Sequence, residues 1–308
     1  MIDSNKYYGC FMGLAAGDAL GAPYEGGPIE RLVWKMLGKT KSGRCRYTDD
    51  TQMSIDLANS FLEQGLIDQD HLAQTFATSY RWSRGYGPSA ATLLKKIAKG
   101  EHWSDVNRLR FKEGSLGNGA AMRAPVVAMI YPNNADLLAV AVTKCSEITH
   151  AHPLAIEGAQ LIAFVTCAAL NDLPLDIVLE SLPKECSSTI FSSKIECCVR
   201  FVSANQVVAV SELKRNLGNG IVATESCATA IYFGLKYKDE SFESMLRDIA
   251  KLGGDVDTIG AMAGAIWGAY NGGHTFSPMA PRIESSEEIL GLSQRLFEFS
   301  NSTIGEQA

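Results

Sequence analysis

Glycine recurs at every fourth position in two distant segments, and this spacing constrains the fold more than any other feature of the sequence. The first set is Gly9, Gly13, Gly17 and Gly21, and the second set is Gly260, Gly264, Gly268 and Gly272. Residues four apart share one face of a helix, and a face of glycines lets another backbone approach closely. Glycine costs roughly 1 kcal/mol per interior helical position relative to alanine, so four in a row need a packing reason. We therefore expect two close-packed helices at the centre of one domain.

Helical periodicity dominates the rest of the chain as well. Apolar residues between Asp49 and Glu63 fall on one helical face, which predicts an amphipathic helix. The segment Leu154–Leu170 is apolar on nearly all sides and predicts a buried central helix. Further helices are expected over 224–236 and 242–251. The predicted fold class is all-α.

Little in the sequence suggests a sheet or a second domain. The best strand candidate, Val207–Val210, is too short to build a sheet. No linker rich in proline or serine divides the 308 residues, of which 46% are apolar. We expect a compact single domain over residues 1–308, with a core at about 5–276 and a peripheral tail after Phe276.

Charge and cysteine usage exclude several classes of protein. A formal net charge of −6 argues against general nucleic-acid binding, which needs a dominant basic face. The eight cysteines include no CxxC pair, which argues against a zinc ribbon or a thioredoxin motif and favours buried, reduced thiols. The polar N-terminus and the lack of an apolar run of about 20 residues predict no signal peptide and no membrane span. We expect a cytoplasmic monomer.

The first polar cluster is Tyr47-Thr48-Asp49-Asp50-Thr51, just before the amphipathic helix. Thr48 or Asp49 alone could be an N-cap that accepts a hydrogen bond from a free backbone amide. Capping explains one oxygen-bearing side chain, whereas four stand here in succession. Adjacent carboxylates repel each other unless a cation or hydrogen-bond donors hold them, and such hard oxygen ligands suit Mg²⁺ or Mn²⁺.

A second cluster, Gly253-Gly254-Asp255-Val256-Asp257-Thr258, stands at the start of the C-terminal glycine helix. An N-cap after a glycine turn is again the simpler interpretation. Two such clusters, each at the start of a helix, together offer four carboxylates and two or three hydroxyls. That inventory suits a pair of oxygen-ligated divalent ions with open positions for substrate and water.

Five segments occur here in the order in which the ADP-ribosylglycohydrolase family has them, and the chain resembles that family over residues ~10–270. The segments are Gly17-Asp18-Ala19-Leu20-Gly21, Thr48-Asp49-Asp50-Thr51, Gly117-Asn118-Gly119-Ala120-Ala121-Met122-Arg123, Thr149-His150-Ala151-His152 and Gly254-Asp255-Val256-Asp257-Thr258-Ile259-Gly260. The resemblance implies a compact helical fold with a central binuclear site for two Mg²⁺ or Mn²⁺ ions.

The resemblance also implies roles for individual residues. It assigns the metal ligands to Thr48, Asp49, Asp50, Asp255, Asp257 and Thr258. Glu25 matches the family's mobile glutamate, which closes over the site and is a candidate base. The catalytic set is then Glu25, Asp49, Asp50 and Asp257.

Two further segments resemble the subgroup that acts on serine-linked ADP-ribose and poly(ADP-ribose). They are Arg84-Gly85-Tyr86-Gly87 and Phe111-Lys112-Glu113-Gly114-Ser115-Leu116-Gly117-Asn118-Gly119. The subgroup implies substrate contacts at Gly87, Gly114, Ser115, Gly117 and His150. Glycine-rich turns suit this role because their exposed N–H groups can bind a pyrophosphate. The chain departs from the subgroup in one residue fewer between Phe111 and Gly114, and in Leu116 where an aromatic ring stacks on the adenosine.

These expectations lead to a metal-dependent hydrolase that cleaves the glycosidic bond between ADP-ribose and a modified acceptor. Serine is the favoured acceptor, arginine is an alternative, and the products are ADP-ribose and the free acceptor. The partner is an ADP-ribosylated protein or another ADP-ribose conjugate. Two other hypotheses remain open, a hydrolase of a phosphoanhydride in an ADP-ribose-related compound and a non-catalytic ADP-ribose-binding protein.

Three weaker signals favour structural interpretations. His150 and His152 lack zinc-ligand partners at a motif spacing, so one histidine is expected to contact ligand or backbone. The segment Gly218–Ala223 resembles a dinucleotide fingerprint but follows no strand, which predicts a turn between helices. Arg123 is expected to bond to nearby carbonyl groups.

Overall fold

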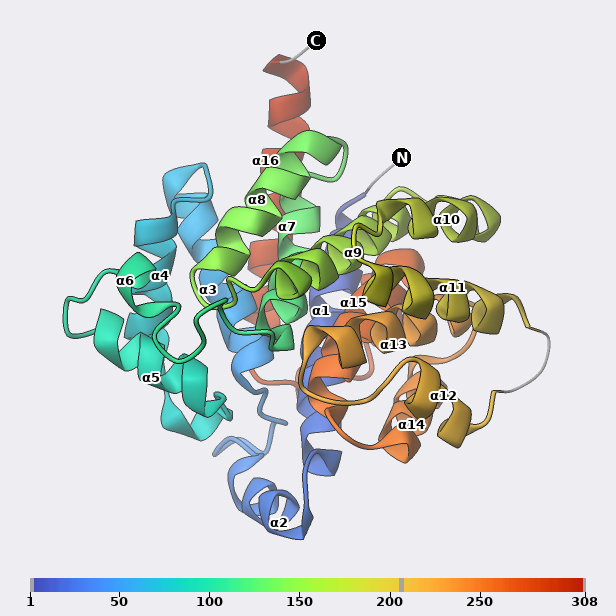
Figure 1. The fold of residues 1–308 in the computed structure, drawn as a ribbon, viewed down its shortest axis with the longest axis horizontal. Coiled ribbons are helices and arrows are strands. Elements are labelled where there is room, and N and C mark those ends of the chain that lie inside the picture. The colour runs from blue at the N-terminus through green and yellow to red at the C-terminus, as the bar shows by residue number, and fades with distance from the viewer. Residues whose placement is uncertain (1–2, 205–207, 307–308) are drawn as a thin grey trace.

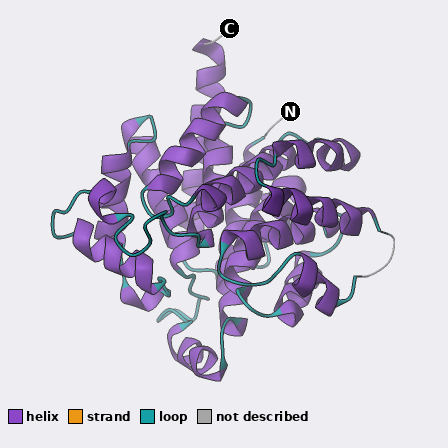
Figure 2. Ribbon diagram, viewed as in Figure 1, coloured by secondary structure: helices purple, strands orange, loops and turns teal. Residues whose placement is uncertain are grey.

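A computed structural model describes residues 3–204 and 208–306, and within these residues it contains helices and no strands (Figure 2). The all-α prediction is confirmed. The sixteen α-helices of the described residues are α1 (Ser4–Gly21), α2 (Pro28–Leu37), α3 (Asp49–Gln64), α4 (Gln69–Ser79), α5 (Pro88–Ile97), α6 (Trp103–Val106), α7 (Ala124–Ile130), α8 (Ala135–Glu147), α9 (Pro153–Leu170), α10 (Leu175–Ser181), α11 (Thr189–Ser203), α12 (Val210–Asn216), α13 (Ala223–Lys236), α14 (Phe242–Leu252), α15 (Val256–Asn271) and α16 (Ser286–Glu306).

Six short 3-10 helices lie in the connections between the helices of residues 3–204 and 208–306. They are η1 (Ala22–Tyr24), η2 (Trp82–Arg84), η3 (Asn118–Arg123), η4 (Leu182–Glu185), η5 (Gly273–Phe276) and η6 (Ala280–Arg282).

The two glycine-spaced helices, α1 and α15, pack against each other in antiparallel directions. A Cβ atom at Gly9, Gly13 or Gly17 would collide with a backbone carbonyl oxygen of α15, namely that of Gly268, Gly264 or Gly260. The spacing therefore has the packing role that we expected, and the structure adds that each set is the other's partner. Because the helices are antiparallel, the C-terminal end of α1 lies beside the N-terminal end of α15.

The remaining helices surround this central pair. Figure 1 shows α3 to α6 on one side of the pair and α10 to α14 on the other, with α2 projecting at the lower edge. The predicted helices at 224–236 and 242–251 are α13 and α14. Helix α9 is long and apolar enough to cross a membrane, but 72% of it is buried inside the protein, as predicted for a central helix.

Two expectations about the C-terminal third of the chain differ from the structure or lie partly outside it. The tail after Phe276 is less peripheral than we predicted, because α16 packs on α1, α3 and α7 and buries Ile289 and Leu296 completely. The strand candidate Val207–Val210 falls partly outside the described residues, and its last residue begins α12.

Candidate metal centre

The first aspartate cluster begins α3, close to the end of α1. Thr48 is the N-cap of α3, and its hydroxyl accepts a hydrogen bond from the backbone N–H of Asp50. One hydroxyl therefore fulfils the capping role that we considered for this segment. The Asp49 and Asp50 carboxylates stand in the first turn, where the partial positive charge of the helix terminus favours anions.

Asp18, on the last turns of α1, holds this cluster in place. Its carboxylate is fully buried and accepts hydrogen bonds from the backbone N–H groups of Thr48 and Thr51 at 2.9 to 3.0 Å. The Thr51 hydroxyl donates a further bond at 2.6 Å. The central helix thus positions the segment that carries Asp49 and Asp50.

The second cluster begins α15. Asp255 is the N-cap residue, but its side chain makes no capping bond and instead accepts a hydrogen bond from the Asn118 amide. The Asp257 carboxylate accepts a bond from the backbone N–H of Thr258 at 2.9 Å. The Thr258 hydroxyl donates to Asp50 Oδ1 at 3.3 Å, so the two clusters are in contact across the α1–α15 end.

These oxygens fit a divalent cation. Carboxylate oxygens of Asp18, Asp50 and Asp257 lie within 4.8 Å of one another, and so do those of Glu25, Asp255 and Asp257. The Oδ2 atom of Asp50 is buried with no hydrogen-bond partner. A buried carboxylate oxygen without a donor is unfavourable unless a cation compensates it. Carboxylate ligands of this kind suit Mg²⁺ or Mn²⁺.

Both clusters open into one pocket with a volume of about 810 Å³. Its lining includes the acidic residues and the hydroxyl of the two clusters, namely Asp49, Asp50, Asp255, Asp257 and Thr258. It also includes all five residues expected to contact substrate, namely Gly87, Gly114, Ser115, Gly117 and His150. Thr48, the remaining predicted metal ligand, does not line the pocket, because its hydroxyl caps α3.

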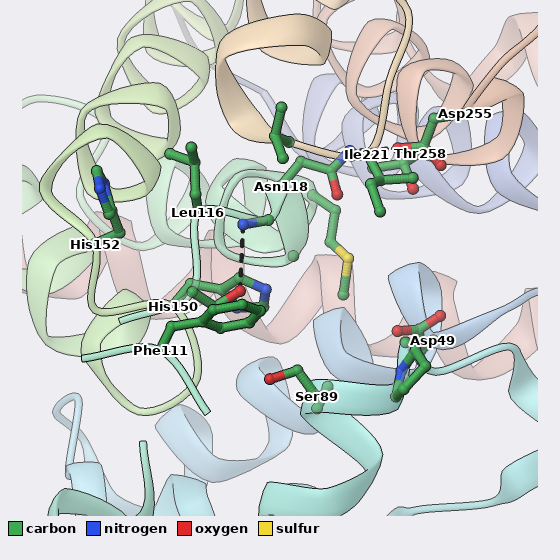
Figure 3. A pocket seen from close by; sticks show the side chains of 18 of the residues that line it. Asp49, Ser89, Phe111, Leu116, Asn118, His150, His152, Ile221, Asp255 and Thr258 are labelled. Carbon is green, nitrogen blue, oxygen red and sulfur yellow. Dashed lines mark hydrogen bonds between the residues drawn. The ribbon is translucent and has the colours of Figure 1, made fainter. Parts of the chain in front are cut away.

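The pocket has two chemically different sides. Figure 3 shows Asp49, Asp255 and Thr258 on one side, and Phe111, Leu116, His150 and His152 on the other. Carboxylates gather on the first side, whereas a glycine-rich turn and aromatic rings form the second. A ligand of nucleotide size can therefore place one end against the candidate metal centre and its remainder along the turn.

Glu25 joins the acidic side from the short connection between η1 and α2. The residue is half-buried, lines the pocket and has an extended backbone, followed by Gly26 in the left-handed region with φ of 65°. A glycine at such a φ lets the connection turn without strain. The carboxylate can therefore reach the cluster from outside the two helices.

His152 and Arg123 make the contacts with backbone groups that the sequence predicted. The guanidinium of Arg123 donates to the carbonyl oxygens of Gly119 and Cys145, as predicted. His152 caps α9 by accepting from the Leu154 amide, while His150 is buried against the pocket. The segment Gly218–Ala223 connects α12 to α13, as predicted for a turn.

Burial and neighbouring negative charge raise the pKa of every aspartate in the two clusters. Burial, reinforced by Asp18, raises the pKa of Asp49 to about 8. Burial, reinforced by Glu25, raises that of Asp255 to about 7. Burial raises the pKa of Asp18 to about 6, although hydrogen bonds from Thr51 and Thr48 oppose the change.

We expect the protein without divalent cations to lose thermal stability as the pH rises from about 5 to about 8. The pKa of these carboxyls is about 3.9 in the unfolded chain and higher in the folded chain, so the folded chain binds protons more tightly. The stabilisation by these protons is complete below a pH of about 3.9, and it is lost as the pH rises through the folded-state pKa values. Saturating Mg²⁺ replaces the protons and should remove the loss. Melting curves in EDTA and in Mg²⁺ measure both effects, and a Tm in EDTA that rises over this range would contradict the expectation.

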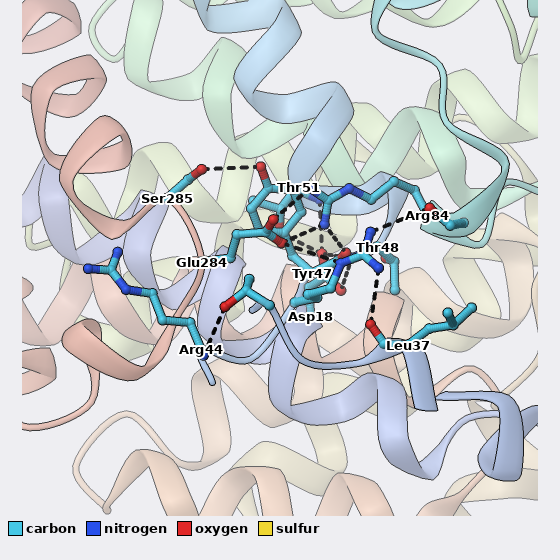
Figure 4. A network of polar contacts seen from close by, with 12 residues as sticks. Asp18, Leu37, Arg44, Tyr47, Thr48, Thr51, Arg84, Glu284 and Ser285 are labelled. Atoms are coloured by element: carbon cyan, nitrogen blue, oxygen red, sulfur yellow. Dashed lines mark hydrogen bonds and ion pairs between the residues drawn. The ribbon is translucent and has the colours of Figure 1, made fainter. Parts of the chain in front are cut away.

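A second polar network holds the peptide that precedes the first cluster (Figure 4). Arg84 donates to the Tyr47 carbonyl oxygen at 2.8 Å and pairs with both carboxylate oxygens of Glu284, at 2.6 and 3.1 Å. Its guanidinium also lies 4.0 Å from the centre of the Tyr47 ring. The C-terminal segment thereby fixes the peptide that precedes Thr48, and it ties that peptide to the turn that carries Gly87.

Glu284→Gln is expected to lower the free energy of unfolding by about 2 kcal/mol, because it leaves a largely buried Arg84 without its counter-charge. Affinity for Mg²⁺ should fall as well, since the Thr48–Asp50 segment loses support. Urea denaturation and calorimetry with Mg²⁺ measure the two effects. The matched control is Glu287→Gln, which breaks the exposed pair with Arg44 and should change stability by no more than about 0.5 kcal/mol. Equal effects of the two variants would contradict this role for Glu284.

No role for Asp18, Asn118 or Glu284 was predicted from the sequence. Asp18 could have been suspected, because it is the one acidic residue of an otherwise apolar, glycine-spaced segment. Asn118 was visible only as part of a glycine-rich motif, and its bond to Asp255 joins residues 137 positions apart. Nothing in the local sequence identifies Glu284.

Comparisons of the sequence and of the structure with known proteins point to one family. A family model described as ADP-ribosylglycohydrolase matches residues 2–303. The protein named ADP-ribosylhydrolase ARH3 from Xenopus tropicalis is 33% identical over 87% of this chain and 87% of its own length. The protein of the same name from Danio rerio is 31% identical over 96% of this chain and 90% of its own length. A solved structure named ADP-ribosylglycohydrolase-related protein complex is 26% identical, with a TM-score of 0.73 over 96% of this chain and 98% of that one.

Proposed function

The chain belongs to the ADP-ribosylglycohydrolase family of hydrolases, and we propose that it cleaves the glycosidic bond between ADP-ribose and a serine acceptor in a reaction that depends on two divalent ions. The observation that carries this proposal is the meeting of both aspartate clusters and Glu25 in one pocket. The pocket volume of about 810 Å³ lies within the range of small-molecule sites. Similarity to the proteins named ADP-ribosylhydrolase ARH3 supports hydrolysis of an ADP-ribose linkage.

The chemistry of the donors supports Mg²⁺ or Mn²⁺ as cofactor. Asp49, Asp50, Asp255, Asp257 and Thr258 would hold the ions from within the pocket, with Thr48 as a further candidate. When bound, the ions supply positive charge that binds ribose hydroxyls and lowers the pKa of water. Asp18 and Asn118 hold the residues of the two clusters in place through the hydrogen bonds described above.

The chain's own residues orient the substrate around the bond to be cleaved. The turn with Gly114, Ser115 and Gly117 lies across the pocket from the carboxylates. The N–H groups of Gly114 and Gly117 donate to the Phe111 carbonyl oxygen and to Ser115 Oγ, so the Ser115 hydroxyl is the side-chain group of this turn that can donate to a pyrophosphate. The distal ribose then lies at the acidic side, where developing positive charge at its anomeric carbon is stabilised by carboxylates. Glu25, which lines the same pocket, would take a proton from water or protonate the leaving oxygen.

Product analysis tests this proposal. The protein would be incubated with Mg²⁺ and matched peptides that carry ADP-ribose on serine or on arginine. Release of ADP-ribose with faster cleavage of the serine peptide supports the proposal. Faster cleavage of the arginine peptide would transfer the assignment to a guanidinium acceptor, which Glu25 could pair with. Release of AMP would indicate a phosphoanhydride hydrolase, and binding without any product would indicate a non-catalytic ADP-ribose-binding protein.

Leu116 offers a test of the position of the adenosine. The residue lines the pocket, and its carbonyl oxygen accepts from the Ala223 amide, which fixes the backbone of the turn. Leu116→Tyr should tighten ADP-ribose binding by about 1 kcal/mol, because an aromatic ring adds a stacking surface for the base. Calorimetry with ADP-ribose measures the change, with Leu116→Met as the aliphatic control. Unchanged affinity would show that Leu116 does not face the adenosine.

A further inference from the structure

We propose that Arg123 and Thr149 are positioning residues that hold His150 as the tautomer with its proton on Nε2, so that Nε2 donates a hydrogen bond to an oxygen of the bound ADP-ribose. The inference rests on the proposed function only for the identity of the ligand. The tautomer itself follows from contacts within the protein.

The direction of each hydrogen bond follows from Arg123. This side chain is fully buried, and a guanidinium can only donate. It donates to the Gly119 carbonyl oxygen at 2.5 Å, to the Cys145 carbonyl oxygen at 2.8 Å and to the Thr149 hydroxyl at 2.8 Å. Two of these acceptors are carbonyl groups, which have no proton to donate. Of the three acceptors, the Thr149 hydroxyl is the one that can itself donate a hydrogen bond.

The Thr149 hydroxyl lies 2.8 Å from His150 Nδ1. The Thr149 oxygen accepts from Arg123, and Nδ1 is the acceptor that the described residues offer to the hydroxyl's own proton. If Nδ1 donated instead, that buried hydroxyl proton would have no partner, so Nδ1 accepts and carries no proton. The ring is neutral, since burial and the nearby Arg123 charge lower the pKa of His150 to about 3. A neutral imidazole has one N–H group, which must then be on Nε2.

The glycine-rich turn leaves room for the His150 ring beside the pocket. A Cβ atom at Gly117 or Gly119 would lie only 3.0 or 2.9 Å from Nε2, so glycine at both positions lets the ring lie against the turn. His150 lines the pocket, and within the described residues the structure assigns no hydrogen-bond acceptor to Nε2. Figure 3 shows the ring on the side of the pocket opposite Asp49 and Asp255.

The N–H group on Nε2 of His150 affects which ligands the pocket favours. A buried N–H without an acceptor is unfavourable, so the site favours a ligand that presents an oxygen to Nε2. The donor is neutral and carries no proton that titrates near neutral pH. His150 therefore acts as a fixed donor and not as an acid, and its contribution to binding should not change between about pH 6 and about pH 8.

The tautomer is measurable directly by ¹⁵N NMR of the histidine side chains. The chain has five histidines, and His150→Gln identifies the signal that disappears. The proposal expects the free wild type to show a protonated Nε2 and an unprotonated Nδ1. A protonated Nδ1 in the wild type would overturn it, whatever the behaviour of the variants.

Two variants of Thr149 separate positioning from packing. Thr149→Val keeps the shape but removes the hydroxyl, so Nδ1 loses its donor, and we expect a mixture of tautomers and an ADP-ribose affinity about tenfold lower. Thr149→Ser keeps the hydroxyl and should preserve the wild-type tautomer and most of the affinity. Calorimetry with ADP-ribose in Mg²⁺ measures the affinities, and circular dichroism checks that both variants fold.

The outcomes of the two proposals are distinguishable. Wild type that binds ADP-ribose, with the same affinity and tautomer in Thr149→Val, would overturn the positioning role and leave the proposed function intact. Wild type that fails to bind ADP-ribose would overturn the proposed function together with the identity of the ligand. If Thr149→Val does not fold, the wild-type tautomer still tests the proposal, because a protonated Nδ1 would overturn it.

Discussion

Asp257→Asn is expected to abolish hydrolysis of ADP-ribosylated peptides while leaving the protein folded. In the part of the chain that the structure describes, Asp257 is the one residue that belongs to both acidic groups, with Asp18 and Asp50 in the first and Glu25 and Asp255 in the second. Asparagine at position 257 carries no negative charge, so both groups lose one carboxylate. Loss of metal-assisted charge stabilisation of several kcal/mol corresponds to a rate at least about a thousandfold lower.

Stability and activity should change in opposite directions in this variant. Burial and the charges of Glu25 and Asp50 raise the pKa of Asp257 well above its ordinary value, so its ionised form destabilises the protein without cations. Asp257→Asn should therefore melt at the same or a higher temperature than wild type in EDTA near pH 8. Addition of Mg²⁺ should stabilise wild type and fail to stabilise the variant.

The control is Asp56→Asn, on the same helix as Asp50 but away from the pocket. Asp56 is also buried, which raises its pKa to about 7, and it accepts hydrogen bonds from Gln52 and Ser79. We expect this variant to keep its response to Mg²⁺ and its activity. Stabilisation of Asp257→Asn by Mg²⁺ as large as that of wild type, or full activity after exhaustive chelation of wild type, would contradict a metal centre at these aspartates.

The sequence predicted the features that have a local cause. Glycine at every fourth position is a local pattern, and it correctly indicated close-packed helices. The pattern could not indicate that α1 and α15 pack on each other. The glycine face of either helix could equally have packed on another helix with small residues. The excess of carboxylates over capping needs was likewise local, and the structure brings Asp50 and Thr258 into contact.

The supporting residues escaped the sequence analysis because their partners lie far along the chain. Asp18 acts through the backbone N–H groups of Thr48 and Thr51, which no side-chain pattern reveals. Glu284 lies in a segment that resembles a polar tail, yet it pairs with Arg84 across 200 positions. Arg123 was expected to bond to carbonyl groups, and only the fold shows that Thr149 and His150 continue this chain of bonds.

Glu25→Gln is expected to lower kcat by about 10²–10⁴, the range typical of a lost general acid or base, with ADP-ribose affinity nearly unchanged. Glutamine preserves the shape of the side chain but cannot take up a proton. Glu25 lies in the connection between η1 and α2, outside the two helices that carry the aspartates, so its replacement leaves both clusters intact. Single-turnover kinetics and calorimetry measure the rate and the affinity separately.

Metal binding distinguishes the roles that Glu25 can have. Its charge raises the pKa of Asp255 and Asp257, so Glu25→Gln should let both aspartates ionise more readily and bind Mg²⁺ as tightly as wild type or more tightly. Weaker Mg²⁺ binding would instead make Glu25 a metal ligand, and an equal loss of ADP-ribose affinity would make it an anchor for the substrate. Partial recovery of the rate of Glu25→Ala by added formate would support proton transfer, because formate can occupy the space of the missing carboxylate. A rate in Glu25→Gln within about twofold of wild type would exclude this residue from the chemical step.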